Sequence, residues 1–275
     1  MRTVAVGTAG TALLLVLMGC SGEAGSGPDA APTPPPSSPS ASTSADTGTA
    51  APPPAPSSTP DESLDESPPP GVVPGTKRRV RHLGIDASHH QGPIDWRQVA
   101  GDGITFAYLK ATEGTTYADP TFADHRATAL DHGLRVGGYH YFQLCSSGAE
   151  QAAHFVEVLG DQSAGNLLPP ALDLELAGSC EVPPPRDVLL AEVRSFLDGV
   201  EEATGREPIV YLFPDFEARF GFAAELDDHR QWVRSLGVEP DRTWWVWQRT
   251  DQGTVAGIAG PVDVNVMWRR ETVGR

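Results

Sequence analysis

The sequence has too few basic residues for a typical nucleic-acid-binding protein, and it lacks the clustered Cys and His residues of a zinc protein. It carries 20 basic against 36 acidic residues, for a net charge of −16. An acidic chain has no basic footprint for phosphate contacts, so nucleic acid is not an expected partner. No Cys and His residues are spaced as in a zinc site, and we expect neither a metal nor another cofactor.

Long hydrophobic runs are also missing. The apolar stretch Ala12–Met18 is shorter than the roughly 20 residues that a membrane-spanning helix needs. It lies between Arg2 and Cys20, in the order of a secretion signal. The string Leu17-Met18-Gly19-Cys20 resembles a bacterial lipobox, in which cleavage leaves a lipid-bearing cysteine at the new N-terminus. We therefore predict that residues 1–20 are a lipoprotein signal peptide and that Cys20 is lipidated; a plain signal peptide is the alternative.

Residues 21–79 contain no aromatic residue. Of the 26 prolines in the chain, 15 lie between residues 21 and 76, among Ser, Ala, Thr and Gly. Such a segment buries too little apolar surface to offset its ordering entropy, so we predict a disordered linker with polyproline II bias. At full extension its 56 residues up to position 76 would reach about 170 Å. The linker can therefore carry a domain away from a membrane.

Residues 80–275 hold every Trp, Tyr and Phe of the chain and are predicted to form one domain, acting as a monomer. With Cys20 assigned to lipid, Cys145 and Cys180 are left as a pair in an exported chain. Because disulfides persist outside the cytosol, we predict a bond between them in preference to two free thiols.

Strand and helix patterns alternate through this domain. Expected strands are 83–87, 104–111, 134–142, the segment around Asp173, 209–213, 244–248 and 262–267, and expected helices are 93–99, 120–132, 149–159, 185–204 and 215–220. The alternation predicts an α/β fold with a parallel sheet, and both a doubly wound sheet and a barrel would satisfy it.

Asp173-Leu174-Glu175 is the most informative segment for function. On a strand the side chains alternate, so Asp173 and Glu175 share one face while Leu172, Leu174 and Leu176 fill the other. The acids lie near the strand's carboxyl end, where α/β barrels place their catalytic groups. Two nearby carboxyls, one protonated and one ionised, are suited to breaking a glycosidic bond. A pair of solvated acids on an edge strand is the alternative.

Further polar residues end other predicted strands. Asp86 and Asp263 are catalytic candidates from the first and last strands. The alternatives are that Asp86 caps the following turn and that Asp263 is an exposed edge residue. Converging carboxylates should raise one another's pKa. Candidate sugar contacts are Tyr139, Tyr211, Trp247 and Gln248. We expect the His89-His90 pair to pack in its loop rather than to bind a metal.

The string Gly84-Ile85-Asp86-Ala87-Ser88-His89-His90-Gln91-Gly92 resembles the opening of glycoside hydrolase family 25, the Chalaropsis-type lysozymes. Other motifs follow in the family's order: Ile94-Asp95-Trp96, Phe106 to Gly114, Asp119 with Phe122, Gly137 to Phe142, Leu172-Asp173-Leu174-Glu175, Trp247-Gln248 and Val262-Asp263-Val264-Asn265. The resemblance covers essentially all of residues 83–268.

This resemblance implies a flattened, irregular (β/α)-barrel of the (β/α)5(β)3 type. It implies hydrolysis of the β-1,4 bond between N-acetylmuramic acid and N-acetylglucosamine, with peptidoglycan glycan strands as the partner. Glu175 would be the general acid/base, Asp173 would orient the 2-acetamido group or stabilise the transition state, and Asp86 and Asp263 would complete an acidic floor. Covalent and acetamido-assisted mechanisms both fit.

Two other functions also fit the sequence: a non-catalytic peptidoglycan-binding module and a chitin-active glycosidase. The expected location is extracellular, either anchored to the outer face of the cytoplasmic membrane or secreted. The lipid anchor is then the only expected membrane contact, since an acidic domain should not adhere to anionic polymers by charge alone.

Overall fold

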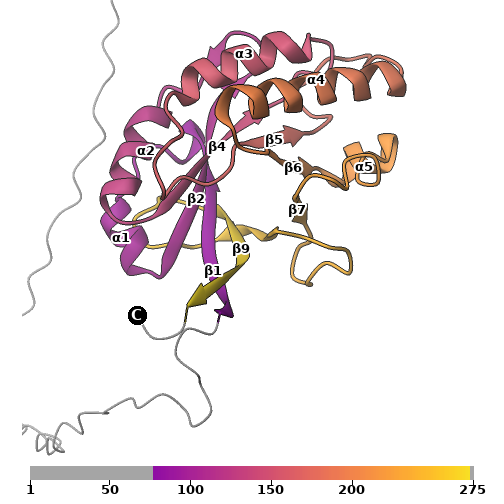
Figure 1. Cartoon of the computed structure of the whole chain (residues 1–275). Coiled ribbons are helices and arrows are strands. Elements are labelled where there is room, and N and C mark those ends of the chain that lie inside the picture. The colour runs from indigo at the N-terminus through magenta and orange to yellow at the C-terminus, as the bar shows by residue number, and fades with distance from the viewer. Residues whose placement is uncertain (1–76, 273–275) are drawn as a thin grey trace, which may run out of the picture. The chain divides into compact units, whose positions relative to one another are not determined.

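The computed structural model describes residues 77–272, and these form a closed barrel with helices packed against part of its outer surface (Figure 1). Eight strands follow one another in the order β1-β9-β8-β7-β6-β5-β4-β2, and pairing of β1 with β2 closes the circle. The short β3 pairs with Thr112 and Glu113 at the C-terminal end of β2, beyond the residues of β2 that pair with β1. The predicted signal peptide, nearly all of the predicted linker and the lipidation site at Cys20 lie outside the described residues.

The chain order confirms the predicted barrel type. Within the described range five strand–helix units precede three strands. The strands are β1 (Lys77–Ala87), β2 (Ile104–Glu113), β3 (Tyr117–Ala118), β4 (Arg135–Tyr141), β5 (Ala171–Leu174), β6 (Ile209–Leu212), β7 (Gln231–Arg234), β8 (Val246–Gly253) and β9 (Val262–Thr272). The helices are η1 (His89–Gln91), α1 (Trp96–Gly101), α2 (Phe122–Asp131), α3 (Gly148–Leu159), α4 (Arg186–Thr204) and α5 (Pro214–Phe220).

The edges of several elements differ from the prediction. Strand β1 begins at Lys77, so the last three residues assigned to the linker, 77–79, are paired with β9. Strand β9 continues to Thr272 for the same reason, since each strand supplies the other's hydrogen bonds. Strand β5 ends at Leu174, one residue before Glu175.

The interior of the barrel is filled by pairing small with large side chains. Gly84 lies directly opposite Phe106, and Gly137 directly opposite Tyr108. A β-carbon at Gly137 would lie 2.3 Å from Cε1 of Tyr108, so only glycine fits there. Phe106 and Tyr108 are fully buried. The barrel is therefore a packed core that is open only at the carboxyl ends of its parallel strands.

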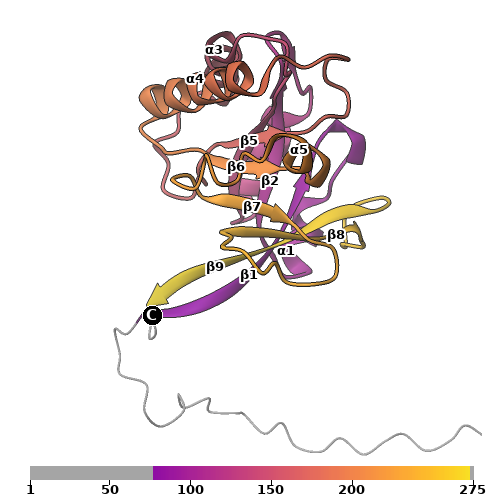
Figure 2. The same ribbon diagram turned by 90° about the vertical axis from the view of Figure 1, so that its right-hand side faces the viewer.

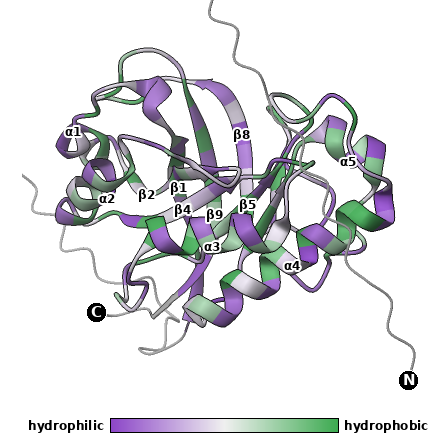
Figure 3. Cartoon of the chain, turned by 90° about the horizontal axis from the view of Figure 1, so that it is seen from above, coloured by the Kyte–Doolittle hydropathy of each residue, from purple (hydrophilic) through white to green (hydrophobic). Residues whose placement is uncertain are grey.

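The helices cover only part of the barrel. Seen from above, α1 and α2 lie on the left of the barrel, α3 and α4 below it and α5 on the right, whereas no labelled helix lies beside β8 (Figure 3). The outer layer is held by aromatic packing, as between His140 and Phe196, whose rings stack 4.8 Å apart. Burial lowers the pKa of His140 to about 3, so this histidine is a neutral core residue. None of the helices described here has both the length and the apolarity needed to cross a bilayer.

Candidate active site

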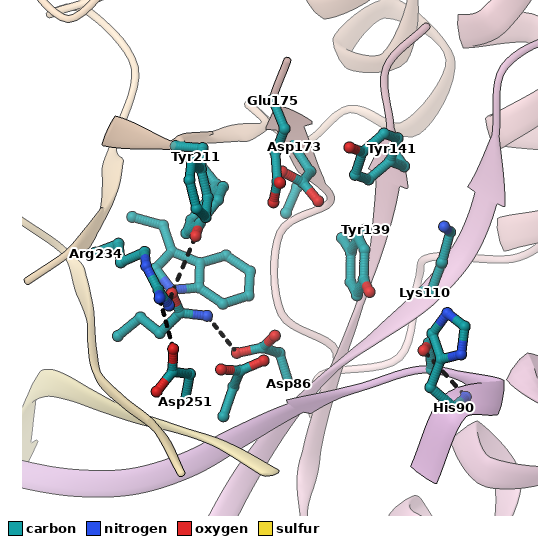
Figure 4. A pocket seen from close by; sticks show the side chains of 16 residues that line it. Asp86, His90, Lys110, Tyr139, Tyr141, Asp173, Glu175, Tyr211, Arg234 and Asp251 are labelled. Atoms are coloured by element: carbon teal, nitrogen blue, oxygen red, sulfur yellow. Dashed lines mark hydrogen bonds and ion pairs between the residues drawn. The ribbon is translucent and has the colours of Figure 1, made fainter. Parts of the chain in front are cut away.

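The four predicted catalytic carboxyl groups meet in a cleft of about 330 Å³ at one end of the barrel (Figure 4). Asp86 ends β1, Asp173 lies on β5, Glu175 directly follows β5, and Asp263 begins β9. Because β9 runs antiparallel to β1, its first residues lie beside the carboxyl ends of the parallel strands. The residues lining the cleft are Asp86, Ser88, His90, Lys110, Tyr139, Tyr141, Ala171, Asp173, Glu175, Tyr211, Phe213, Trp232, Arg234, Gln248, Asp251 and Asp263.

The Asp173–Glu175 pair arises as the alternation predicts. Leu172 and Leu174 are fully buried on the opposite face, and Leu176 packs against the same core. The carboxyls of Asp173 and Glu175 point together into the cleft (Figure 4). Oδ1 of Asp173 is buried, and no group within residues 77–272 donates a hydrogen bond to it. A buried acceptor without a donor is unfavourable, so this oxygen is available to a donor from a bound molecule.

Burial controls the protonation of this pair. It raises the pKa of Glu175 to about 7, with the charges of Asp215 and Asp263 adding to the effect and Arg234 opposing it. Burial also raises the pKa of Asp173 well above its usual range, and the negative charges of Glu175 and Asp86 raise it further. Glu175 can therefore hold a proton near neutral pH and release it, as a general acid must.

Asp86 and Asp263 form a second pair of unequal acids. They are direct partners across β1 and β9, so their side chains share the interior face. Asp86 Oδ2 accepts hydrogen bonds from Asn265 Nδ2 at 2.7 Å and Gln248 Nε2 at 3.3 Å. Burial raises the pKa of Asp263 to about 8, and the charge of Asp86 raises it further. Burial also raises the pKa of Asp86, but its hydrogen bonds favour the ionised form.

A network of side chains holds Gln248 against Asp86. The Tyr211 hydroxyl and Arg234 Nη1 each donate to Gln248 Oε1 at 3.0 Å, which turns its amide nitrogen toward Asp86. Gln248 and Tyr211 were both predicted as sugar contacts. Both line the cleft, but their polar groups are engaged with neighbouring side chains.

Of the predicted aromatic contacts, Tyr139 and Tyr211 line the cleft, whereas Trp247 does not. Trp247 Nε1 donates to the Ser235 carbonyl at 2.7 Å, and its ring packs near Trp244. Neighbouring strand residues point to opposite faces, so Trp247 and Gln248 cannot both enter the cleft, and a sugar contact at Trp247 stays a prediction.

Sequence reasoning missed several residues that the structure brings into the cleft. Trp232 contributes an indole, whose Nε1 donates to Asn265 Oδ1 at 2.9 Å. Arg234 Nη2 lies 2.7 Å from Asp251 Oδ2, and Lys110 Nζ lies 2.6 Å from Glu113 Oε2. Lys110 lies at the end of a predicted strand, as the predicted catalytic acids do. This position was the only feature of the sequence that pointed to Lys110 as a cleft residue. Trp232 and Arg234 lie on β7, a segment to which the sequence analysis assigned no strand or helix.

A disulfide joins the two loops beside Glu175. Cys145 and Cys180 are bonded as predicted, with their Cα atoms 5.9 Å apart. Between them, Gln143 Nε2 donates to the Gly178 carbonyl at 3.1 Å and Leu144 N to Ser179 Oγ at 2.8 Å. The segment that follows Glu175 is therefore tied to the loop after β4.

The histidine pair lies at the rim of the cleft and is held by Asp119. His89 Nδ1 lies 2.8 Å from Asp119 Oδ2, and the rings of His89 and His90 lie 4.0 Å apart. Within residues 77–272, no three His, Cys, Asp or Glu side chains are grouped so as to hold a metal ion.

Comparison with known proteins shows which family this chain matches. Residues 85–258 match the model of "Glycosyl hydrolases family 25". Lysozyme M1 of Streptomyces globisporus is 33% identical over 197 residues, which cover 66% of this chain and 66% of that one. An N,O-diacetylmuramidase of Arthroderma benhamiae is 33% identical over 59% of this chain and 74% of its own length. The crystal structure of a lysozyme from Streptomyces coelicolor superposes with a TM-score of 0.61 at 31% identity, covering 70% of this chain and 92% of that one.

Proposed function

The chain belongs to glycosyl hydrolase family 25, and on this basis we propose that it is a lysozyme that cleaves peptidoglycan. The bond would be the β-1,4 link between N-acetylmuramic acid and N-acetylglucosamine. The observation that carries this proposal is the cleft itself, in which Glu175 has a pKa of about 7 beside a second buried carboxyl.

In the proposed mechanism Glu175 protonates the leaving glycosidic oxygen. The unpartnered Oδ1 of Asp173 accepts the N–H of the substrate's 2-acetamido group, which fixes that group beside the reacting carbon. Asp86 and Asp263 form the floor of the cleft, and Asp86, whose hydrogen bonds favour the ionised form, stabilises the positive charge that develops on the sugar ring. Tyr139 and Trp232 supply flat surfaces for the sugar.

The test is release of new reducing ends from purified peptidoglycan by the wild-type chain and by Glu175→Gln. Loss of the general acid should lower the rate on the order of 10²-fold or more. Glu225→Gln, a change of the same type at an exposed ion pair with Arg186, should hydrolyse like wild type. Equal rates for Glu175→Gln and wild type would overturn the assignment. Faster cleavage of chitin oligomers than of muropeptides would move the substrate class to chitin.

We propose that the enzyme works outside the cytoplasmic membrane and is held there by a lipid on Cys20. Support comes from the location of the substrate and from the lipobox-like string that ends at Cys20. In the producing bacterium Cys20→Ser should abolish labelling by radioactive palmitate and should move the enzyme out of the membrane fraction. Labelling that survives this substitution would contradict the proposal.

A further inference from the structure

A two-stranded ribbon at the foot of the barrel concentrates positive charge. It consists of residues 77–82 of β1 and 267–272 of β9, which pair from Lys77↔Thr272 to His82↔Met267. Both side views show it projecting past the barrel (Figures 1 and 2). Six of its twelve residues are basic, and one, Glu271, is acidic.

This charge is opposite to that of the rest of the domain. Residues 77–272 contain 29 acidic and 18 basic residues, so outside the ribbon 28 acids face 12 bases. The exposed bases of the ribbon are Lys77, Arg78, Arg79, Arg81, Arg269 and Arg270. Among the described residues, these arginines take part in no ion pair. The net acidity of the domain is therefore an average over two regions of opposite sign.

One face of the ribbon combines arginine with tryptophan. Directly paired residues share a face, so Arg79 lies beside Arg270 and Arg81 beside Trp268. The guanidinium carbons of Arg79 and Arg81 lie 5.1 and 5.8 Å from the Trp268 ring centroid. Arginine and tryptophan together are typical of surfaces that meet lipid headgroups.

A shallow groove of about 360 Å³ lies along this face, next to the loop between β7 and β8. Its lining residues are Arg79, Glu239, Arg242, Thr243, Trp244 and Trp268. The two guanidinium groups can bind phosphate through paired hydrogen bonds, and the two indoles suit the boundary between headgroups and acyl chains. Glu239 is the one acid in this lining.

We propose that the ribbon and its groove dock on an anionic phospholipid surface. The charge is complementary, and the groove offers both phosphate-binding and interfacial side chains. The chain preceding the described residues joins the domain at Lys77, the tip of the ribbon. That preceding chain contains Cys20, and a linker of the predicted length would let the ribbon reach a membrane to which Cys20 is attached.

Docking in this way would orient the enzyme. Lys77 and Asp86 lie near opposite ends of β1, so the ribbon and the cleft lie at opposite ends of the barrel. A domain that rests on the bilayer by its ribbon presents the cleft outward. The lipid contact does not depend on the proposed lysozyme activity, and the two can fail separately.

The experiment is co-sedimentation of the full chain, carrying Cys20→Ser to prevent lipidation, with lipid vesicles. Vesicles of phosphatidylcholine containing 30% phosphatidylglycerol should bind at least tenfold more tightly than pure phosphatidylcholine, and salt should weaken the difference. The quadruple substitution Arg78→Gln, Arg79→Gln, Arg269→Gln and Arg270→Gln should lower the affinity for anionic vesicles about 100-fold or more.

A matched variant controls for total charge. Arg97, Arg194, Arg219 and Arg249 are exposed elsewhere on the barrel, and changing all four to Gln should leave vesicle binding near that of wild type. Both variants should keep the wild-type melting temperature and peptidoglycan hydrolysis in solution. The proposal fails if the ribbon variant binds like wild type, if both variants lose binding equally, or if wild type does not prefer anionic vesicles. Ribbon-dependent binding to a purified phosphate-rich wall polymer but not to vesicles would overturn lipid as the occupant.

Discussion

At the scale of single residues, we expect function to depend on acids whose pKa values are set by their surroundings. Burial raises the pKa of Asp86, but two amide hydrogen bonds favour its ionised form, whereas its direct partner Asp263 has a pKa of about 8. Glu175 has a pKa of about 7. The types of these residues could be read from the sequence, but their proton occupancy depends on burial and on partners such as Arg234 that come from other strands.

The pKa of Glu175 predicts how activity varies with pH. As the general acid it must be protonated, so kcat/KM should fall as pH rises through about 7. The charge of Asp215 raises this pKa, so Asp215→Asn should move the alkaline limb to lower pH, by roughly half a unit or less. Glu225→Gln should leave the limb in place. If the alkaline limb of the kcat/KM profile does not move with Asp215→Asn, a group other than Glu175 controls that limb.

The same residue predicts a gain in stability at alkaline pH when the acid is removed. Native Glu175 keeps its proton up to about pH 7, whereas an unfolded glutamate loses it near 4.5. Between these values folding takes up a proton, so this group lowers the free energy of unfolding as pH rises. Glu175→Gln should therefore melt a few °C above wild type at pH 8 and close to wild type at pH 4. Thermal unfolding at both pH values measures this, and an equal difference at both would contradict it.

At the scale of elements, apolar patterns predicted most of the fold. Five strand–helix units and the late strands lie close to their expected ranges because each has a buried face with its own period. The prediction failed where long-range pairing decides the outcome. Residues 77–79 look like part of a polar linker until β9 supplies their hydrogen bonds. Strand β7 is four residues long and carries no alternation that distinguishes it.

The Cys145–Cys180 disulfide is expected to stabilise the domain and to hold the loop that carries Glu175. Cys145–Cys180 closes a segment of 35 residues that includes all of β5, so removing the bond should lower the free energy of unfolding by about 2–4 kcal/mol. The loop should also loosen around Glu175. Cys145→Ser with Cys180→Ser should therefore lower kcat several-fold at a temperature where the variant is still folded. Circular dichroism at the assay temperature checks folding, and an unchanged kcat would limit the bond to a stabilising role.

At the scale of the whole molecule, the described residues form a closed barrel with its own core. All five acids that line the cleft come from residues 77–272. Residues 77–275 alone should therefore hydrolyse soluble glycan fragments with the same kcat/KM as the full chain. Only activity that requires membrane attachment should fall. Peptidoglycan turnover in cells that express each form measures that difference. A large loss on soluble fragments would mean that the preceding residues contribute to the site.

The pairing of Asp86 with Asp263 has a consequence for when the enzyme can act. One acid comes from the first barrel strand and the other from the last, and they become partners only when β9 adds to β1. A chain still emerging from the ribosome or the export channel has Asp86 but no opposing strand. We therefore expect hydrolysis to begin only in a single late step, when β9 has joined β1, and chains that lack β9 to be inactive.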